Sequence, residues 1–226
     1  MNPIIKNYNK ILTDIRTSEK LFLRKHNSVK LVAVSKTFSD KDIKPLLELD
    51  HVCFGENRVQ EAHKKWMPLK INFKNIKLHL IGPLQSNKVN QALEVFDCIQ
   101  TIDRQKIAIK INESIKSNEL LDFNKFEFMI QVNTGSEPQK SGIKVCDVLD
   151  FYKWCKKETN LNISGLMCIP PFNESPEEHF ELLNDLANQC NLNQRSMGMS
   201  KDFNLAVKCG ATHVRVGSGI FGSRST

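Results

Sequence analysis

The sequence alternates short apolar runs with longer amphipathic segments from residue 31 to the C-terminus. The apolar runs predict buried β-strands, and they lie at residues 31–35, 51–54, 77–81, 97–102, 126–132, 162–169, 194–198 and 213–217. Helical patterns separate them, and a further helical segment at about residues 3–26 precedes the first run. Strands that alternate with helices indicate a parallel sheet. Eight such units in 226 residues predict an α/β fold, a single TIM-type (β/α)8 barrel with an extra N-terminal helix.

Nothing in the sequence divides the chain into separate units. No linker rich in Pro, Gly or Ser interrupts the alternation, so we expect residues 1–226 to form one domain. The densest turn signal is IPPFNESPEE at residues 169–178, which is typical of a strand-to-helix loop. Ser175 is a favourable N-cap and Pro176 suits the first helical position, so a helix should begin there.

Composition narrows the class of function. The formal net charge is +7, but the lysines are scattered among acidic residues and no nucleic-acid-binding module accompanies them. A small phosphorylated ligand fits this charge better than a nucleic acid does. No apolar run is long enough to span a membrane, and the N-terminal residues lack the pattern of a signal peptide.

The cysteines indicate a reducing environment. The seven cysteines contain no CxxC pair, so they predict neither a zinc ribbon nor a disulfide framework. Cys53, Cys98 and Cys168 lie in apolar runs, where a free cysteine behaves as a small hydrophobic residue. We therefore expect a cytoplasmic protein without a metal site.

Polar residues follow the predicted strands. Lys36 follows the first strand and Asn57 the second, while residues 196–200 and 215–218 close the last two. In a parallel barrel the carboxyl ends of all strands meet at one mouth, which is where barrel proteins place their sites. Two interpretations of Lys36 are open. Its side chain either reaches solvent at the end of the strand or provides a partly desolvated amine that forms a Schiff base with an aldehyde.

The last two units carry a pattern typical of an anion site. Ser200 precedes a helical segment and is a good N-cap, and a helix N-terminus offers free N–H groups to a phosphate. Gly217 and Gly219 would let backbone amides approach an anion, and Ser218 adds a hydroxyl. Barrels frequently bind phosphate with the loops after strands seven and eight. A capping serine without a ligand is the alternative for Ser200.

Arg215 alternates with Val214 and Val216, so its side chain should point into the barrel. An unpaired guanidinium there would be costly. One interpretation is a buried ion pair with Glu56 or Asp103. The other is a hydrogen bond to a ring nitrogen of a ligand, which would stay unprotonated because arginine does not give up its proton in proteins.

A lysine that captures an aldehyde, an anion site and a donor to a ring nitrogen together describe pyridoxal 5′-phosphate. The chain resembles the pyridoxal phosphate homeostasis protein family, single-domain relatives of the barrel domain of alanine racemase with the PLP fold type III. The resemblance covers ordered blocks over almost the whole chain: VAVSK (32–36), FGENRVQEA (54–62), HLIGPLQSNK (79–88), IDR (102–104), QVNTGSEPQKSGI (131–143), ISGLMCIPP (163–171), SMGMSKDF (196–203) and GATHVRVGSGIFGSR (210–224). The chain departs from the family at Arg58, where tyrosine is frequent, and in the variable loop at residues 134–138.

The resemblance implies specific roles for residues of this chain. Lys36 would carry the cofactor as an internal aldimine. The residues around the cofactor would be Asn57, Ser196, Met199, Ser200, Arg215, Gly217 and Ser218. The family has no established catalytic activity, so the chain is expected to hold, buffer and deliver pyridoxal 5′-phosphate, with PLP-dependent apo-enzymes as recipients.

The alternative is an amino-acid racemase-like enzyme. Such an enzyme needs a second acid/base group on the cofactor face opposite the lysine. In the racemases a tyrosine from a separate domain supplies it, whereas Tyr8 and Tyr152 of this chain fall in helical segments away from the predicted mouth. We therefore expect a non-catalytic binder that is a monomer or weak dimer and has no nucleic-acid or membrane partner. Lys140 is either a surface lysine, which we favour, or a second cofactor contact.

Overall fold

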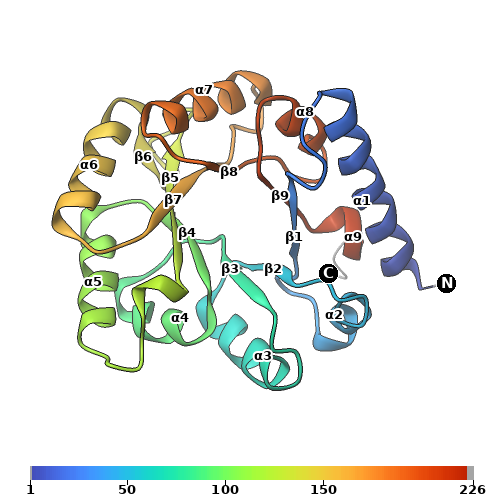
Figure 1. Cartoon of the computed structure of the whole chain (residues 1–226), viewed down its shortest axis with the longest axis horizontal. Coiled ribbons are helices and arrows are strands. Elements are labelled where there is room, and N and C mark those ends of the chain that lie inside the picture. The colour runs from blue at the N-terminus through green and yellow to red at the C-terminus, as the bar shows by residue number, and fades with distance from the viewer. Residues whose placement is uncertain (1, 223–226) are drawn as a thin grey trace.

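The eight predicted strands close into a parallel barrel (Figure 1). The computed structural model describes residues 2–222, so the last two residues of the 210–224 block lie outside the described range. Around the barrel the strands follow in the order β1 (Lys30–Val34), β2 (Cys53–Glu56), β3 (Lys77–Leu80), β4 (Cys98–Ile102), β5 (Glu127–Asn133), β7 (Ile163–Cys168), β8 (Gln194–Ser196) and β9 (His213–Val216). β4 pairs with β5, and β9 pairs with β1 through Lys30 opposite His213. These two pairings close the ring.

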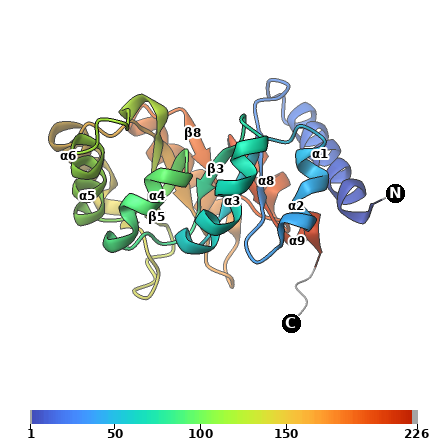
Figure 2. The ribbon, with the colours of Figure 1, turned by 90° about the horizontal axis from the view of Figure 1, so that it is seen from below.

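Helices cover the outside of the barrel, as the two views show (Figures 1 and 2). Those that connect successive strands are α2 (Asp40–Leu47), α3 (Val59–Asn72), α4 (Val89–Val95), α5 (Gln105–Lys116), α6 (Val148–Glu158), α7 (Pro176–Gln189) and α8 (Phe203–Lys208). Short 3₁₀ turns lie at η1 (Ser86–Lys88), η2 (Phe123–Lys125) and η3 (Val145–Asp147). α1 (Pro3–Leu21) precedes the barrel and contacts α8 and the last helix, α9 (Ser218–Phe221). Among residues 2–222 no helix has the length and apolar character needed to cross a membrane.

Two details differ from the sequence-based expectation. The first helix ends at Leu21 and not near residue 26, because Glu19 organises the turn that follows. Its buried carboxylate accepts hydrogen bonds from the amides of Asn27 at 3.1 Å and Val29 at 2.7 Å, and Asn27 has a left-handed backbone (φ 61°). The second difference is a short strand that was not expected, β6 (Ile143–Lys144), which pairs with the end of β5.

The N-cap of α7 is where the sequence predicted it, with Ser175 as the cap and Pro176 as the first helical residue. A preset proline φ and a missing amide hydrogen both suit this position.

The strands separate an outer core from an inner one. Strand side chains that face outward pack with helix side chains in the large apolar core, which includes the fully buried Phe54 and Phe128 from strands and Trp66 from α3. Because side chains alternate along a strand, their neighbours face the interior of the barrel. There Met129 and Met167 pack with Cys98 as a separate cluster. Buried polar residues also occupy the inner strand positions, namely His79, Gln100, Ser196, His213 and Arg215.

Candidate functional site

A cavity of 790 Å³ lies at the carboxyl ends of the strands. Seven of the eight predicted site residues line it: Lys36, Asn57, Met199, Ser200, Arg215, Gly217 and Ser218. The eighth, Ser196, is fully buried beneath the cavity and contacts Arg215. The fold thus brings together residues from both ends of the chain, as expected for the mouth of a parallel barrel.

Lys36 lines this cavity from the turn after β1. Strand β1 continues into this turn, because the amide of Ser35 donates to the carbonyl of Gly55 at 3.0 Å. The next residue, Thr37, then takes a left-handed backbone (φ 68°), and the amide of Phe38 bonds back to the carbonyl of Ser35 at 3.1 Å. The sharp turn presents Lys36 at the mouth of the barrel.

The Arg215 side chain is buried, with 4% of its surface exposed. Its Nη1 donates to Ser196 Oγ and its Nη2 to the carbonyl of Cys168, both at 2.7 Å. Burial lowers the pKa of Arg215 from its ordinary value, an effect opposed by Cys168 and Asp202, and an arginine still keeps its proton at neutral pH.

The expected alternative of an ion pair between Arg215 and Glu56 or Asp103 is wrong. Glu56 bonds to Lys65 at 2.9 Å, and Asp103 bonds to Arg104 at 2.5 Å. Neither carboxylate pairs with Arg215, because each already has a nearer cation.

A chain of buried polar side chains continues from Arg215 across the inside of the barrel. Ser196 Oγ donates to Gln100 Oε1 at 2.6 Å, and Gln100 Nε2 lies 2.8 Å from His79 Nδ1. Burial lowers the pKa of His79 to about 4, so its neutral ring can accept this bond. Gln100 and His79 were not among the predicted site residues, although a polar residue in the middle of each of two apolar strands was a visible signal.

The last two units form the expected Ser and Gly cluster, but Ser200 is not the N-cap of the helix that follows it. α8 begins at Phe203 with Asp202 as its N-cap, and Asp202 also accepts a bond from the amide of Met199. Ser200 Oγ instead accepts from the amide of Gly219 at 3.2 Å and lies 3.3 Å from Ser218 Oγ. The hydroxyl therefore joins the start of α9 and not that of α8.

Gly217, which lines the cavity, packs closely against the end of β1. A Cβ atom there would lie 3.2 Å from the carbonyl oxygen of Val34 and 3.3 Å from the Val34 side chain. A glycine lets β9 and β1 meet at this point.

Lys140 also lines the cavity, from the loop between β5 and β6. Its ammonium group bonds to Glu137 at 2.5 Å and lies 3.5 Å from the carbonyl oxygen of Pro170. Neither tyrosine lines the cavity. The Tyr8 hydroxyl lies 3.1 Å from His51 Nδ1 on the outer side of the barrel, and Tyr152 belongs to α6.

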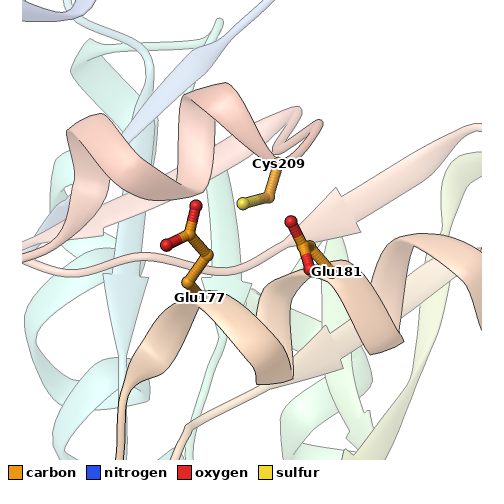
Figure 3. Close-up of side chains that lie close together, drawn as sticks. All are labelled: Glu177, Glu181 and Cys209. Carbon is orange, nitrogen blue, oxygen red and sulfur yellow. The ribbon is translucent and has the colours of Figure 1, made fainter.

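A separate cluster lies between α7 and the end of α8 (Figure 3). Glu177, Glu181 and Cys209 each place one possible ligand atom within 4.8 Å of the others. Burial raises the pKa of the Cys209 thiol to about 11, with help from the two carboxylates, so it is protonated at neutral pH. Lys208 also bonds to Glu177 at 2.6 Å. We assign no metal site to this cluster.

The fold and the match to a known family define the class as alanine racemase-like barrels. The family described as "Alanine racemase, N-terminal domain" matches residues 12–225. An alanine racemase of Clostridium difficile 630 has the same fold, with a TM-score of 0.69 at 15% identity, over 100% of this chain and 58% of that one. At this identity the likeness concerns the fold alone.

Within this class, two comparisons narrow the assignment. The "Pyridoxal phosphate homeostasis protein" of Haemophilus influenzae is 38% identical over 97% of this chain and 95% of its own length. The structure of PipY from Synechococcus elongatus PCC7942 with PLP bound is similar at 29% identity and a TM-score of 0.75, over 92% of this chain and 100% of that one. The chain belongs to the pyridoxal phosphate homeostasis protein family.

Proposed function

We propose that the protein binds pyridoxal 5′-phosphate and serves in the intracellular homeostasis of this cofactor. It would hold the cofactor covalently on Lys36 and buffer or deliver it, without catalysis of its own. The observation that carries the proposal is one cavity lined by a lysine, a buried guanidinium and a cluster of Ser and Gly residues. The names of the relatives and the PLP-bound structure of PipY support it.

The residues present fit this cofactor. Lys36 offers a primary amine to the aldehyde. The hydroxyls of Ser200 and Ser218 are 3.3 Å apart and both residues line the cavity together with Gly217, so hydroxyls and backbone amides could bind an anion there. A volume of 790 Å³ is within the range of small-molecule sites.

Arg215 would face the ring nitrogen of the cofactor. Two of its N–H groups bond to Ser196 and to the carbonyl of Cys168, and a guanidinium has further donors for a ligand. Bound pyridoxal 5′-phosphate supplies an electron-withdrawing ring, but a ring nitrogen that faces arginine stays unprotonated and withdraws electrons weakly. Together with the absence of both tyrosines from the cavity lining, this favours a carrier over a racemase-like enzyme.

Borohydride reduction followed by peptide mass mapping tests the covalent link. We expect the reduced adduct on Lys36, and Lys36→Ala should abolish both the adduct and the absorbance of the bound cofactor. The fold should survive, because the residue lies at the rim and not in either core. Lys140→Ala is the matched control, since Lys140 lines the same cavity and should leave the adduct in place. An adduct wholly on another lysine would contradict the proposal.

Proton exchange tests the assignment as a carrier. Proton NMR of L-alanine and other amino acids in deuterated water, with stoichiometric holoprotein, should show no loss of the α-proton signal. Loss at about 1 s⁻¹ or faster, abolished by Lys36→Ala, would establish the racemase-like alternative instead.

Four further features belong to this proposal. The seven free cysteines support a cytoplasmic location. The recipients would be PLP-dependent apo-enzymes, with neither a nucleic acid nor a membrane as partner. We propose that residues 1–226 act as one domain and that the protein is a monomer or weak dimer.

A further inference from the structure

The turn that carries Lys36 has a strained backbone. Thr37 adopts the left-handed conformation (φ 68°), which is rare for a β-branched residue. Such a conformation persists only where the surroundings hold it in place. The contacts of Thr37 and of Ser35, the two neighbours of Lys36 in sequence, identify what holds it.

Both neighbours of Lys36 are bound by helix α3. The amide of Thr37 donates to Glu61 Oε1 at 2.6 Å. On the other side, the carbonyl of Ser35 accepts from Lys65 Nζ at 2.9 Å. Glu61 and Lys65 are one helical turn apart and lie 3.4 Å from each other, so the same face of α3 holds the backbone before and after Lys36.

A buried carboxylate anchors this arrangement. Glu56 at the end of β2 has no exposed surface, and its Oε1 accepts from Lys65 at 2.9 Å, from Ser35 Oγ at 2.8 Å and from Trp66 Nε1 at 3.0 Å. Lys65 is itself only 11% exposed. Because hydrogen bonds to charged groups are strong in such enclosed surroundings, a shift of this face of α3 would disturb the turn.

We propose that Glu61 and Lys65 are positioning residues for Lys36, a pair we call the α3 clamp. The clamp holds Thr37 in its strained conformation and so fixes the direction in which Lys36 enters the cavity. The proposal rests on the proposed function, in which Lys36 holds the cofactor. Without Glu61 the turn should relax, and the amine should spend less time where an aldehyde can reach it.

The test combines the loss of the clamp with relief of the strain. Glu61→Ala removes the acceptor for the Thr37 amide, and we expect an affinity for pyridoxal 5′-phosphate about tenfold lower, the loss of roughly one charge-assisted hydrogen bond. Thr37→Gly removes the penalty of the left-handed backbone. In the double variant Glu61→Ala/Thr37→Gly, the affinity for pyridoxal 5′-phosphate should return to within about threefold of that of the unmutated protein. Glu61→Gln, which keeps an acceptor oxygen, should lose less than Glu61→Ala.

Glu94→Ala is the matched control, because Glu94 contacts α3 through His63 at 2.8 Å but does not bond to the turn. It should bind the cofactor as the unmutated protein does. A second measurement, without any cofactor, is the hydrogen exchange of the Thr37 amide by NMR. Exchange should be faster in Glu61→Ala and unchanged in Glu94→Ala.

The possible results distinguish a failure of the α3 clamp proposal from a failure of the proposed cofactor binding. If the unmutated protein bound no pyridoxal 5′-phosphate, the proposed function would fail, and the exchange of the Thr37 amide would still decide whether the clamp exists. If the unmutated protein bound the cofactor and Glu61→Ala bound it equally well, the clamp would be refuted. A loss in Glu61→Ala that Thr37→Gly does not recover would also refute it, because the loss would then come from damage elsewhere.

Discussion

Ser200 offers a quantitative test of the anion site. Its hydroxyl bonds to the amide of Gly219 at 3.2 Å and to the hydroxyl of Ser218 at 3.3 Å, which are long distances for such groups. In the free protein, Ser200→Ala should therefore cost no more than about 1 kcal/mol of folding free energy. A bond from the same hydroxyl to a phosphate is worth roughly 1.5–3 kcal/mol, so the affinity for pyridoxal 5′-phosphate should fall about tenfold to a hundredfold.

The assay titrates pyridoxal 5′-phosphate and pyridoxal separately against both proteins and follows the absorbance of the bound form. Pyridoxal lacks the phosphate, so Ser200→Ala should leave its weaker binding unchanged. Ser141→Ala is a suitable control, since Ser141 is exposed and does not line the cavity. If Ser200→Ala lowered the affinities for pyridoxal 5′-phosphate and for pyridoxal equally, the assignment of the anion site to Ser200 would be refuted. Equal affinities of the unmutated protein for pyridoxal 5′-phosphate and pyridoxal would refute it as well.

Two further predictions concern the fold that supports the site. Gly82→Ala should lower both the stability and the affinity for the cofactor, since a Cβ at that position would lie 2.2 Å from the carbonyl oxygen of Asn57; a melting temperature equal to that of the unmutated protein would contradict this. Acid should also destabilise the protein, because burial lowers the pKa of His51 and His79 to about 4 and that of His213 well below its usual value. The unfolded chain takes up protons below about pH 6.5 while the folded one does not, so urea titrations should show the free energy of unfolding falling between about pH 6.5 and 4, by on the order of 3 kcal/mol for His79 alone. In His79→Gln the fall should be smaller.

The barrel could be predicted because its strands are local features of the sequence. Apolar runs such as residues 31–34 and 128–130 mark strands that are buried on both sides, and their alternation with helices fixes the parallel arrangement. β6 could not be predicted in this way. It has only two residues and exists because Ile143 pairs with Val132, a contact that no local pattern encodes.

The site residues at the strand ends could be predicted from the sequence, but the hydrogen bonds between them and the rest of the fold could not. The convergence of Lys36 and Ser200 follows from topology alone, because every strand of a parallel barrel ends at the same mouth. The partners of Arg215 depend on how inner side chains from different strands meet. A carboxylate partner was therefore a reasonable prediction from the sequence, whereas in the structure Arg215 bonds to Ser196 and to the carbonyl of Cys168. The hydrogen bond that the Thr37 amide donates to Glu61 was not predicted either, since it joins a turn to a helix 24 residues away.

The pairing of β9 with β1 has a consequence for synthesis of the protein. Lys36 is synthesised long before Arg215, Gly217 and Ser218, which lie near it in the folded protein. Until His213–Val216 has been added and can pair, the nascent chain has open edges at β1 and β8, which are templates for pairing with other chains. A ribosome adds roughly 5–20 residues per second, so this exposure lasts for seconds. Chains that stop before β9 should therefore both aggregate and fail to retain the cofactor, so binding has to wait until β9 has been synthesised.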